Sequence, residues 1–498
     1  MAENTLYYGD NLDILRKHIG GESADLIYLD PPFNSNATYN ILFPEQNGTP
    51  AASQAKAFED TWEWGPEAGE AYEEVVEAGG QVSLAMQAFH TLLGRSNMLA
   101  YLAMMAPRLM ELRQVMKPTA SIYLHCDPTA SHYLKLLMDA VFGPDNFRRE
   151  IIWSMSAAAG YKSLANNFIR GHDVIFYYAR SGSVIFNKSF NPYSQKQLAR
   201  FTGVDEEGRR YKTITKTRRL YLDEAKGVPI TDVWSDIANF QTVVNAKEKQ
   251  GYPTQKPEAL LERIIKASSN KGDVVLDPFC GCGTTIAAAQ KLGRRWVGID
   301  ITYAAIAVIK KRLKDAYGKS VLYQVIGEPI SLPDAEKLAA EDPYQFQWWA
   351  LDLVDARPTE EKKGADKGID GRLYFHASGD DRGETKQVIF SVKAGHVTAA
   401  HVRDLRGCLD REKAEFGCVL SFNRPTRAMR TEATGVGFYE WTGEIAGKKR
   451  YPRLQLLTIA ELLDGRSLEL PPHESVTFKR APRAKKQERQ LDIGEAES

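Results

Sequence analysis

The chain has little of several features that would narrow its function at once. Its 64 lysines and arginines balance 64 aspartates and glutamates, so any affinity for nucleic acid must come from a local cluster of bases. It has five cysteines, and Cys280 and Cys282 have no histidine nearby, which argues against a metal site. No apolar run approaches the roughly 18 residues that span a membrane, and the first residues form no basic, apolar leader. These absences predict a reduced, cytoplasmic protein without a membrane segment or a bound metal.

Two short motifs stand far apart in the sequence, and each follows an apolar run. Asp30-Pro31-Pro32-Phe33 follows the run 26–29, and Asp277-Pro278-Phe279-Cys280-Gly281-Cys282-Gly283-Thr284-Thr285 follows the run 274–276. Short apolar runs that end in acids are typical of strands buried on both faces of a parallel sheet. Ligands bind such sheets beyond the carboxyl ends of the strands, so both motifs are predicted to lie at the ligand-binding edge.

Two further acids end strand-like segments. Asp300 closes the segment 295–299 about 20 residues beyond the glycine-rich loop, where a nucleotide-binding sheet places a carboxylate on ribose hydroxyls. Asp10 closes the run 6–9 near the N-terminus. The sequence therefore predicts four acids at one edge of an α/β sheet.

In this order the motifs resemble the β class of DNA N6-adenine and N4-cytosine methyltransferases, whose sheet is circularly permuted so that the base clamp precedes the cofactor loop. The resemblance covers about residues 5–315 and includes the segment 252–260. It implies a Rossmann-like α/β sheet that binds S-adenosyl-L-methionine and acts on a flipped base of double-stranded DNA. The catalytic clamp that it implies consists of Asp30, Pro31, Pro32 and Phe33. The cofactor-binding residues that it implies are Asp10, Asp30, Lys256, Pro257, Asp277, Pro278, Phe279, Gly281, Gly283, Thr284, Thr285 and Asp300.

The chemistry expected at the clamp follows from the weak nucleophilicity of an exocyclic base amine. The Asp30 carboxylate and the Pro31 carbonyl are expected to accept its two N–H groups and to stabilise the positive charge that develops as the methyl group arrives. The ring of Phe33 is expected to stack on a base swung out of the duplex. The donor methyl is already activated by its sulfonium, so this chemistry requires no metal.

The identity of the target base is less constrained. Aspartate at the first clamp position favours adenine, because the cytosine enzymes of the class commonly carry serine there. Phenylalanine at position 33, in place of the more frequent tyrosine, leaves the question open. An N4-cytosine methyltransferase, a DNA-binding regulator without turnover, and an RNA or protein methyltransferase are the alternatives. His125 and His172, at strand edges, are interpreted as structural residues rather than catalytic bases.

A basic segment separates the two motifs. Between residues 186 and 222 nine bases accompany three acids, with six aromatic residues interleaved. Such a stretch is usually a solvated basic face, but its position between the catalytic and cofactor halves favours a target-recognition insertion, which we place at 180–250. The candidate DNA-binding residues within it are Arg209, Arg210, Lys212, Lys216, Arg218 and Arg219.

The sequence changes character near residue 333. We predict a methyltransferase domain over 1–332, a linker over 333–343, a second, smaller α/β domain over 344–475 and a charged, disordered tail over 476–498. A restriction-modification or defence system is the expected setting. A separate nuclease partner and a homodimer are both compatible with it.

The second domain resembles the Mrr-like branch of the PD-(D/E)xK restriction-endonuclease fold, through its α-β-β-α-β order and through Asp370 and Lys393. Ser391 stands where that family has Glu or Gln, and Gln347 stands where its first helix often carries Glu. With an acid lost from both places, a divalent metal would be held weakly. Two outcomes stay open: a Mg²⁺-dependent nuclease, which would make the chain a combined enzyme, or a degenerate module that binds DNA or a partner.

Overall fold

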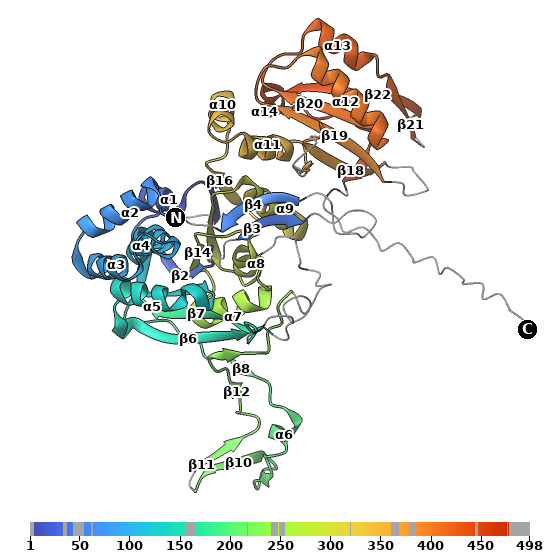
Figure 1. The fold of residues 1–498 in the computed structure, drawn as a ribbon. Helices are drawn as coiled ribbons and strands as arrows, with labels where there is room; N and C mark the ends of the chain where they lie inside the picture. Colours follow the sequence, from blue (N-terminus) through green and yellow to red (C-terminus); the bar gives the residue numbers. More distant parts are fainter. Residues whose placement is uncertain are drawn as a thin grey trace, which may run out of the picture.

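The structure of the protein is a computed structural model (Figure 1). It describes residues 4–32, 37–42, 54–60, 63–155, 166, 168–216, 218–240, 248, 254–318, 320–359, 368–377, 385–443, 447–475 and 477. Among these residues, no helix is long and apolar enough to cross a membrane.

A nine-stranded sheet forms the centre of the molecule, with the order β13-β6-β7-β5-β2-β14-β15-β1-β16. Its strands are β1 (Asn4–Tyr8), β2 (Ala24–Leu29), β5 (Met116–Cys126), β6 (Phe147–Ser154), β7 (His172–Ala179), β13 (Val233–Trp234), β14 (Val274–Asp277), β15 (Arg295–Asp300) and β16 (Tyr323–Ile326). All run parallel except β7, which is antiparallel to β5 and to β6. The predicted motif strands β2 and β14 are therefore neighbours at the middle of the sheet.

Both faces of this sheet are covered by helices, which explains why β2 and β14 are buried along their whole length. Ile27 and Leu29 of β2 pack into one core with helices α1 (Asn11–His18), α3 (Gly80–Leu93), α4 (Asn97–Val115) and α5 (Pro128–Phe142). Leu26 and Tyr28, which point the other way, pack with α7 (Glu258–Ser268), α8 (Thr284–Lys291) and α9 (Tyr303–Tyr317). Three further elements lie between β2 and β5 in the sequence: the strands β3 (Ala37–Leu42) and β4 (Gln54–Asp60), which form a hairpin, and the helix α2 (Pro66–Glu77). The α/β fold expected from the sequence is confirmed.

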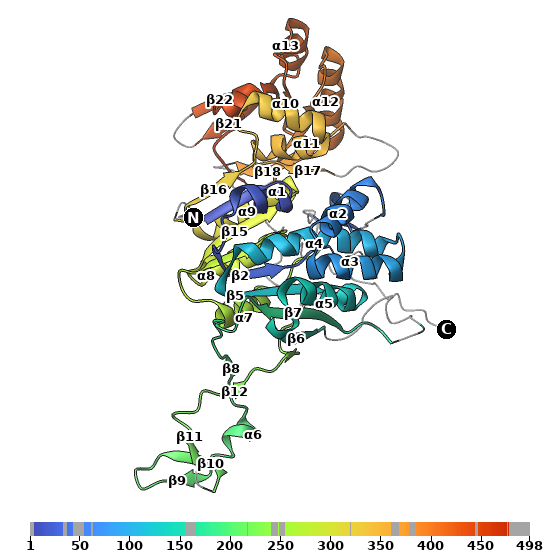
Figure 2. The same cartoon turned by 90° about the vertical axis from the view of Figure 1, so that its left-hand side faces the viewer.

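Residues 180–232, here called the arm, leave the sheet after β7 and return to it at β13. The arm consists of the ribbon β8 (Phe190–Asn191) with β12 (Val228–Pro229), the turn of helix α6 (Gln195–Leu198), and a small sheet of β9 (Gly203–Val204), β10 (Arg210–Thr215) and β11 (Arg218–Tyr221). In Figures 1 and 2 the arm extends away from the nine-stranded sheet, at the end opposite the C-terminal domain. Residues 180–232 of the predicted insertion 180–250 thus fold as a projecting β structure, whereas β13 joins the central sheet and most of the insertion's residues after 240 lie outside the described part.

The C-terminal domain is built on a second sheet, with the order β17-β18-β19-β20-β23 and with β24 beside β18. Its elements are α11 (Pro343–Asp352), β17 (Arg357–Pro358), β18 (Gly371–Ala377), β19 (Lys386–Lys393), α12 (Ala399–Glu412), β20 (Phe416–Ser421), α13 (Arg427–Thr434), β21 (Phe438–Gly443), β22 (Gly447–Pro452), β23 (Leu454–Thr458), α14 (Ile459–Leu463) and β24 (His473–Ser475). The predicted α-β-β-α-β order is present as α11, β18, β19, α12 and β20.

Two boundaries differ from the sequence prediction. The segment 333–343, expected to be a linker, folds as helix α10 (Leu332–Glu341), because Ser331 caps it and its apolar side, including buried Ala335, packs on the C-terminal core. Thr477, assigned to the disordered tail, is buried and its hydroxyl accepts the Tyr374 amide at 2.9 Å. The rest of the predicted tail lies outside the described residues.

Candidate active site at the carboxyl edge of the sheet

Three of the four predicted acids meet where adjacent strands end. Asp30 follows β2, Asp277 ends β14 and Asp300 ends β15, and these strands are hydrogen-bonded neighbours. Burial raises the pKa of Asp277 to about 7, although hydrogen bonds from Thr285 and from the amide of Phe279 oppose the shift. The charges of Asp30 and Asp300 raise it further. This edge therefore gathers three carboxyl groups, and a ligand with positive charge or with N–H and O–H donors suits it.

The glycine-rich loop between β14 and α8 is fixed by backbone contacts to the next strand. The Cys280 amide donates to the Ile299 carbonyl at 3.0 Å, and the Gly281 amide donates to Asp300 Oδ2 at 2.9 Å. Gly283 adopts a left-handed conformation (φ 72°) directly before α8, and a Cβ there would lie 2.6 Å from Ile309 Cγ1. Only glycine fits this turn, which brings the amino end of α8 to the sheet edge.

Asp300 is also held from the other side of its carboxylate. Its Oδ1 accepts the Thr302 amide at 2.9 Å and the Thr302 hydroxyl at 2.8 Å. Burial raises its pKa, against the effect of these hydrogen bonds. Asp300 therefore links the loop to the start of α9 as well as facing the edge.

Asp30 has one oxygen engaged and one free. Lys256 donates to Asp30 Oδ2 at 2.5 Å and also to the Thr254 carbonyl at 3.3 Å. The other oxygen, Oδ1, is buried and accepts no hydrogen bond from the residues that the structure describes. Pro31 is buried and Pro32 is half-buried, whereas Phe33 lies outside the described residues. A buried acceptor without a donor is unfavourable, so this oxygen is suited to bind an N–H group.

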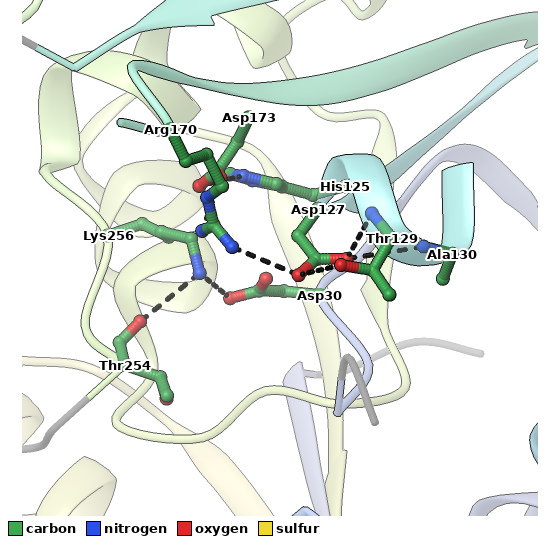
Figure 3. A network of polar contacts seen from close by, with 9 residues as sticks. All are labelled: Asp30, His125, Asp127, Thr129, Ala130, Arg170, Asp173, Thr254 and Lys256. Atoms are coloured by element: carbon green, nitrogen blue, oxygen red, sulfur yellow. Dashed lines mark hydrogen bonds and ion pairs between the residues drawn. The ribbon is translucent and has the colours of Figure 1, made fainter. Parts of the chain in front are cut away.

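A second cation lies on the same edge, because β7 runs antiparallel and begins where β5 ends (Figure 3). Arg170 donates to Asp127 Oδ2 at 3.0 Å and to Asp173 Oδ1 at 2.8 Å. Burial opposes the ionisation of Asp173, but contacts with His125, Lys256 and Arg170 outweigh it and lower its pKa. Lys256 and Arg170 thus offset part of the negative charge around Asp30.

His125 is fully buried and both of its ring nitrogens have partners. Nδ1 lies 2.9 Å from the Tyr28 hydroxyl, and Nε2 lies 3.2 Å from Asp173 Oδ2. This arrangement agrees with the interpretation of His125 as a structural residue. Through its contact with Asp173, His125 helps to position that carboxylate.

Asp10, the fourth predicted acid, is committed to local structure. Its Oδ1 accepts the Leu12 amide at 2.8 Å and so caps α1, and its Oδ2 accepts from Arg108 at 2.6 Å. Arg108 also donates to Asn11 Oδ1 at 2.6 Å, and Asn11 donates to the Pro278 carbonyl at 2.7 Å. Asp10 therefore lies at one end of a chain of contacts that reaches the glycine-rich loop, and its contact with a cofactor stays a prediction.

Several residues that position the site carry no sequence motif. Arg312 of α9 is buried, donates to the Cys282 carbonyl at 3.2 Å and pairs with Glu258 of α7 at 2.6 Å. It ties the glycine-rich loop to two helices. Arg108, Asn11 and Arg170 also hold parts of this edge, and their contacts with Asp10, Pro278 and Asp127 cross 98, 267 and 43 residues of sequence, too far to be found by spacing.

The other predicted cofactor residues lie around the same loop. Thr284 and Thr285 are buried in the first turn of α8, and Pro257 is buried directly before α7. Phe279 is half-buried against the core on the α4 side. The structure thus brings the predicted loop residues to one place.

The six bases singled out in the arm fall into two groups. Arg209 pairs with Asp223 and Glu224 at 2.8 and 2.7 Å, Arg210 donates to the Phe201 carbonyl at 3.1 Å, and Lys212 lies over the Phe201 ring at 4.8 Å. These three hold the arm together. Lys216, Arg218 and Arg219 are exposed around the turn between β10 and β11, where Arg219 lies 4.4 Å over the Tyr211 ring.

The corresponding site of the C-terminal domain is sparsely charged. Lys393 lies 3.4 Å from Asp370 Oδ2, which also accepts the Val392 amide at 2.6 Å. Gln347 donates to the Asp370 carbonyl at 3.2 Å, and Ser391 is buried. In the part of the chain that the structure describes, no three His, Cys, Asp or Glu side chains gather in a way that could hold a metal.

Known proteins with similar sequences include type II methyltransferases, a subunit of a type III restriction-modification enzyme and a DNA adenine methyltransferase. Type II methyltransferase M.EcaI of Enterobacter cloacae is 26% identical over 402 residues, which cover 70% of this chain and 77% of that protein. The Mod subunit of the type III restriction-modification enzyme StyLTI of Salmonella typhimurium is 24% identical over 400 residues, covering 68% and 57%. DNA adenine methyltransferase YhdJ of Escherichia coli is 56% identical over 66 residues, covering 13% and 22%.

Family models match both halves of the chain. Residues 343–464 match the model described as NACHT-associated inactive restriction endonuclease 1. Residues 24–311, more than half of the chain, match the DNA methylase model of the N6 and N4 enzymes, and they include Asp30, the glycine-rich loop and Asp300. With the predicted motifs joined at one sheet edge and this match extending across them, the chain belongs to the DNA methylase family.

Proposed function

We propose that this chain transfers a methyl group from S-adenosyl-L-methionine to the N6 amine of a flipped adenine in double-stranded DNA. The observation that carries the proposal is the buried Oδ1 of Asp30, which has no hydrogen-bond partner among the described residues and lies one strand away from the glycine-rich loop. The family, and relatives that are type II and type III enzymes, favour a role in restriction-modification. A circularly permuted order is supported by the position of β2 before β14 in sequence and beside it in the sheet.

The residues at the edge fit the cofactor. Gly281 has no side chain and a positive φ (49°), so a ligand can approach the loop backbone there, and Asp300 presents a carboxylate at the end of the next strand, where ribose hydroxyls are bound in such sheets. Asp277 and Lys256 line the same edge. S-adenosyl-L-methionine supplies an electrophilic methyl group when bound, and no metal is needed.

The chain's own part in the reaction is to bind and orient the amine. Since Lys256 engages Asp30 Oδ2, the free Oδ1 is the oxygen that accepts an amine proton. The Pro31 carbonyl is the second acceptor, held because each proline fixes its own backbone and restricts the residue before it. Both acceptors stabilise the positive charge that develops on the amine. Phe33 is proposed to stack on the flipped base.

Adenine is preferred over cytosine for two reasons. The clamp begins with aspartate rather than serine, and one relative is an adenine methyltransferase. The N4 amine of cytosine has the same donors, so the alternative is an N4-cytosine enzyme with this same clamp.

We propose that the arm holds the DNA. A two-stranded β ribbon fits the major groove, and the turn between β10 and β11 carries Lys216, Arg218 and Arg219 outward. Arg209, Arg210 and Lys212 then serve the arm's own fold.

The C-terminal domain is proposed to be a module that does not cleave DNA. The single carboxylate beside Lys393 would bind a hydrated Mg²⁺ only weakly, and the matching family model is described as inactive. If the chain serves restriction, a separate nuclease partner cuts the DNA. Homodimer formation stays a prediction.

Sequencing DNA from a bacterial host that expresses the chain, with detection of modified bases, tests this function. We expect N6-methyladenine at one recurring short sequence, and its loss in a host that expresses Asp30→Ala. N4-methylcytosine at a recurring sequence would select the alternative. Unmodified DNA, with the protein folded and present, would contradict the proposal.

A further inference from the structure

The start of helix α9 connects the acidic edge to the C-terminal domain. Tyr303 is the first residue of α9, three residues after Asp300, and its amide donates to Gln345 Oε1 at 2.6 Å. Gln345 belongs to α11, the first helix of the C-terminal domain. The first amides of a helix have no partner within the helix, so a side chain from another domain satisfies one of them here.

A polar cluster fastens the same contact. The Tyr303 hydroxyl donates toward Glu328 Oε1 at 2.9 Å and lies 3.0 Å from Asp352 Oδ2 of α11. Lys310 lies 3.0 Å from Glu328 and 2.9 Å from Asp352. Burial opposes the charge of Lys310, but the two carboxylates outweigh it and raise its pKa. The cluster joins α9 to α11 by charge as well as by the Gln345 bond.

Apolar side chains also join α9 to α11 in one shared core. Tyr303 is 1% exposed and belongs to the same core as Phe346, Trp349 and Leu351 of α11. The Tyr8 ring of β1 packs edge-on against Tyr303, with ring centres 5.6 Å apart. Interdomain contacts that permit relative motion are usually more polar, so a shared apolar core favours a fixed position of α11 against α9.

The path from Gln345 to the glycine-rich loop has few steps. Gln345 holds the Tyr303 amide, and the preceding residue, Thr302, gives its amide and hydroxyl to Asp300 Oδ1. The other oxygen of Asp300 accepts the Gly281 amide. A shift at the start of α9 would therefore move the Asp300 carboxylate and the loop that it holds.

From this geometry we infer that the C-terminal domain is part of the cofactor site, and that Gln345 is a positioning residue for Asp300. The inference rests on the proposed function, because it takes Asp300 to face the cofactor. The domain that resembles a nuclease then has a task in methyl transfer that needs no cleavage. Binding couplings are reciprocal, so the cofactor must also stabilise the docked position of α11.

Two glutamines on α11 provide a matched test in the full chain. Gln345 touches Tyr303 of the methyltransferase half, whereas Gln347 touches the Asp370 carbonyl within the C-terminal domain. Titration calorimetry with S-adenosyl-L-methionine should show binding to Gln345→Ala weaker than to wild type by roughly threefold to tenfold, the worth of one hydrogen bond. Gln347→Ala should bind within about twofold of wild type.

The conservative variant Gln345→Glu distinguishes the loss of the contact with Tyr303 from a general disturbance of the fold. In Gln345→Glu a carboxylate oxygen can still accept the Tyr303 amide, and negative charge is favourable at a helix amino end, so wild-type affinity should return. In kinetics, Gln345→Ala should raise KM for the cofactor and leave kcat unchanged. Hydrogen exchange of wild type should show that the cofactor slows exchange in α11 and at the start of α9.

The outcomes distinguish this inference from the function on which it rests. Wild type that does not bind S-adenosyl-L-methionine overturns both. If wild type binds the cofactor, three results overturn the inference alone. These are a Gln345→Ala affinity equal to wild type, an equal loss of affinity in Gln347→Ala, and a Gln345→Glu affinity that stays as low as that of Gln345→Ala. Far-ultraviolet circular dichroism and a melting curve of each variant show that the compared proteins are folded.

Discussion

Two aspartates of this chain pair with a lysine, and the surroundings of the two carboxylates differ. Asp30 meets Lys256 at 2.5 Å and keeps a buried oxygen without a described partner, beside Asp277 at the end of the next strand. Asp370 meets Lys393 at 3.4 Å and accepts the Val392 amide of β19 with the same oxygen. We propose that the first carboxylate binds a ligand through this oxygen, whereas the second holds a backbone amide of its own domain. The residue pair alone therefore does not specify a reaction site, because the unsatisfied oxygen and the neighbouring acids decide it.

The largest effect should follow from removing the available carboxylate. Asp30→Ala should lower kcat for methyl transfer by about 10²–10³-fold or more, because an acceptor for the amine protons is lost at the developing charge. Cofactor affinity should stay close to wild type, since the glycine-rich loop is held by Asp300 and Arg312 instead. Tritium transfer from labelled cofactor and calorimetry measure the two quantities.

A suitable control is Asp13→Ala, which removes an exposed acid that pairs with Lys17 one turn away in α1. It should leave both quantities unchanged. Loss of cofactor binding together with activity in Asp30→Ala would mean that Asp30 supports the fold, as Asp370 does.

A smaller effect is expected at the end of β15. Asp300→Ala should weaken cofactor binding by roughly 1.5–3 kcal/mol, the worth of a hydrogen bond to a charged group. Part of this loss would come through the loop, because the Gly281 amide loses its acceptor. Asp300→Asn, which keeps an acceptor, should lose less. An unchanged dissociation constant in Asp300→Ala would remove this residue from the cofactor site.

The arm should show an effect that depends on salt. Replacing Lys216, Arg218 and Arg219 together by alanine should weaken DNA binding and lower the slope of log affinity against log salt by up to about 2.7, since each phosphate contact contributes about 0.9. Fluorescence anisotropy at several salt concentrations measures it. The control is a triple variant that removes the same number of exposed positive charges from the C-terminal domain: Arg424→Ala, Arg427→Ala and Arg430→Ala. Equal slopes in the arm variant and wild type would exclude the turn from the DNA interface.

The smallest effect is expected at the second lysine-aspartate pair. Lys393→Ala should leave methyl transfer unchanged and should remove no nuclease activity, because purified wild type is expected to have none. Agarose electrophoresis of unmethylated plasmid incubated with Mg²⁺ checks this. Nicking by wild type that disappears in Lys393→Ala would make the chain a combined methyltransferase and nuclease.

Much of the acidic edge could be predicted from sequence because its signals are local. Buried runs such as 26–29 and 274–276 end in acids, and parallel strands bring such ends together. The turn at Gly283 is similarly local, because a left-handed residue before a helix favours glycine. Asp30 and Asp277 could therefore be predicted to lie at the same sheet edge, whereas the pairing of β2 with β14 is seen only in the structure.

Long-range contacts could not be predicted in this way. Arg312 reaches Glu258 and Gln345 reaches Tyr303 across 54 and 42 residues of sequence, and a polar residue on a helix gives no sign of which buried partner it meets. The bases of the arm show the same limit. Arg209 and Arg218 look alike in sequence, yet the first is engaged by two acids and the second is exposed.

The helix α10 illustrates a different limit. Prolines at 333 and 343 suggested a break, but each lies in the first turn of a helix, where proline is tolerated because its missing N–H would have no partner there. The expected linker is therefore a helical connection. It carries the chain directly into α11 and the contact with α9.

The most direct test of the central claim is a nucleoside analysis of DNA methylated by the purified protein. Unmethylated plasmid is incubated with S-adenosyl-L-methionine and either wild type or Asp30→Ala, digested to nucleosides and examined by mass spectrometry. We expect N6-methyladenosine in its deoxy form with wild type and none with Asp30→Ala, although the variant still binds the cofactor. Equal methylation by both proteins, or no methylated base with wild type that binds cofactor and DNA, would contradict the assignment of Asp30 as the group that acts on the amine.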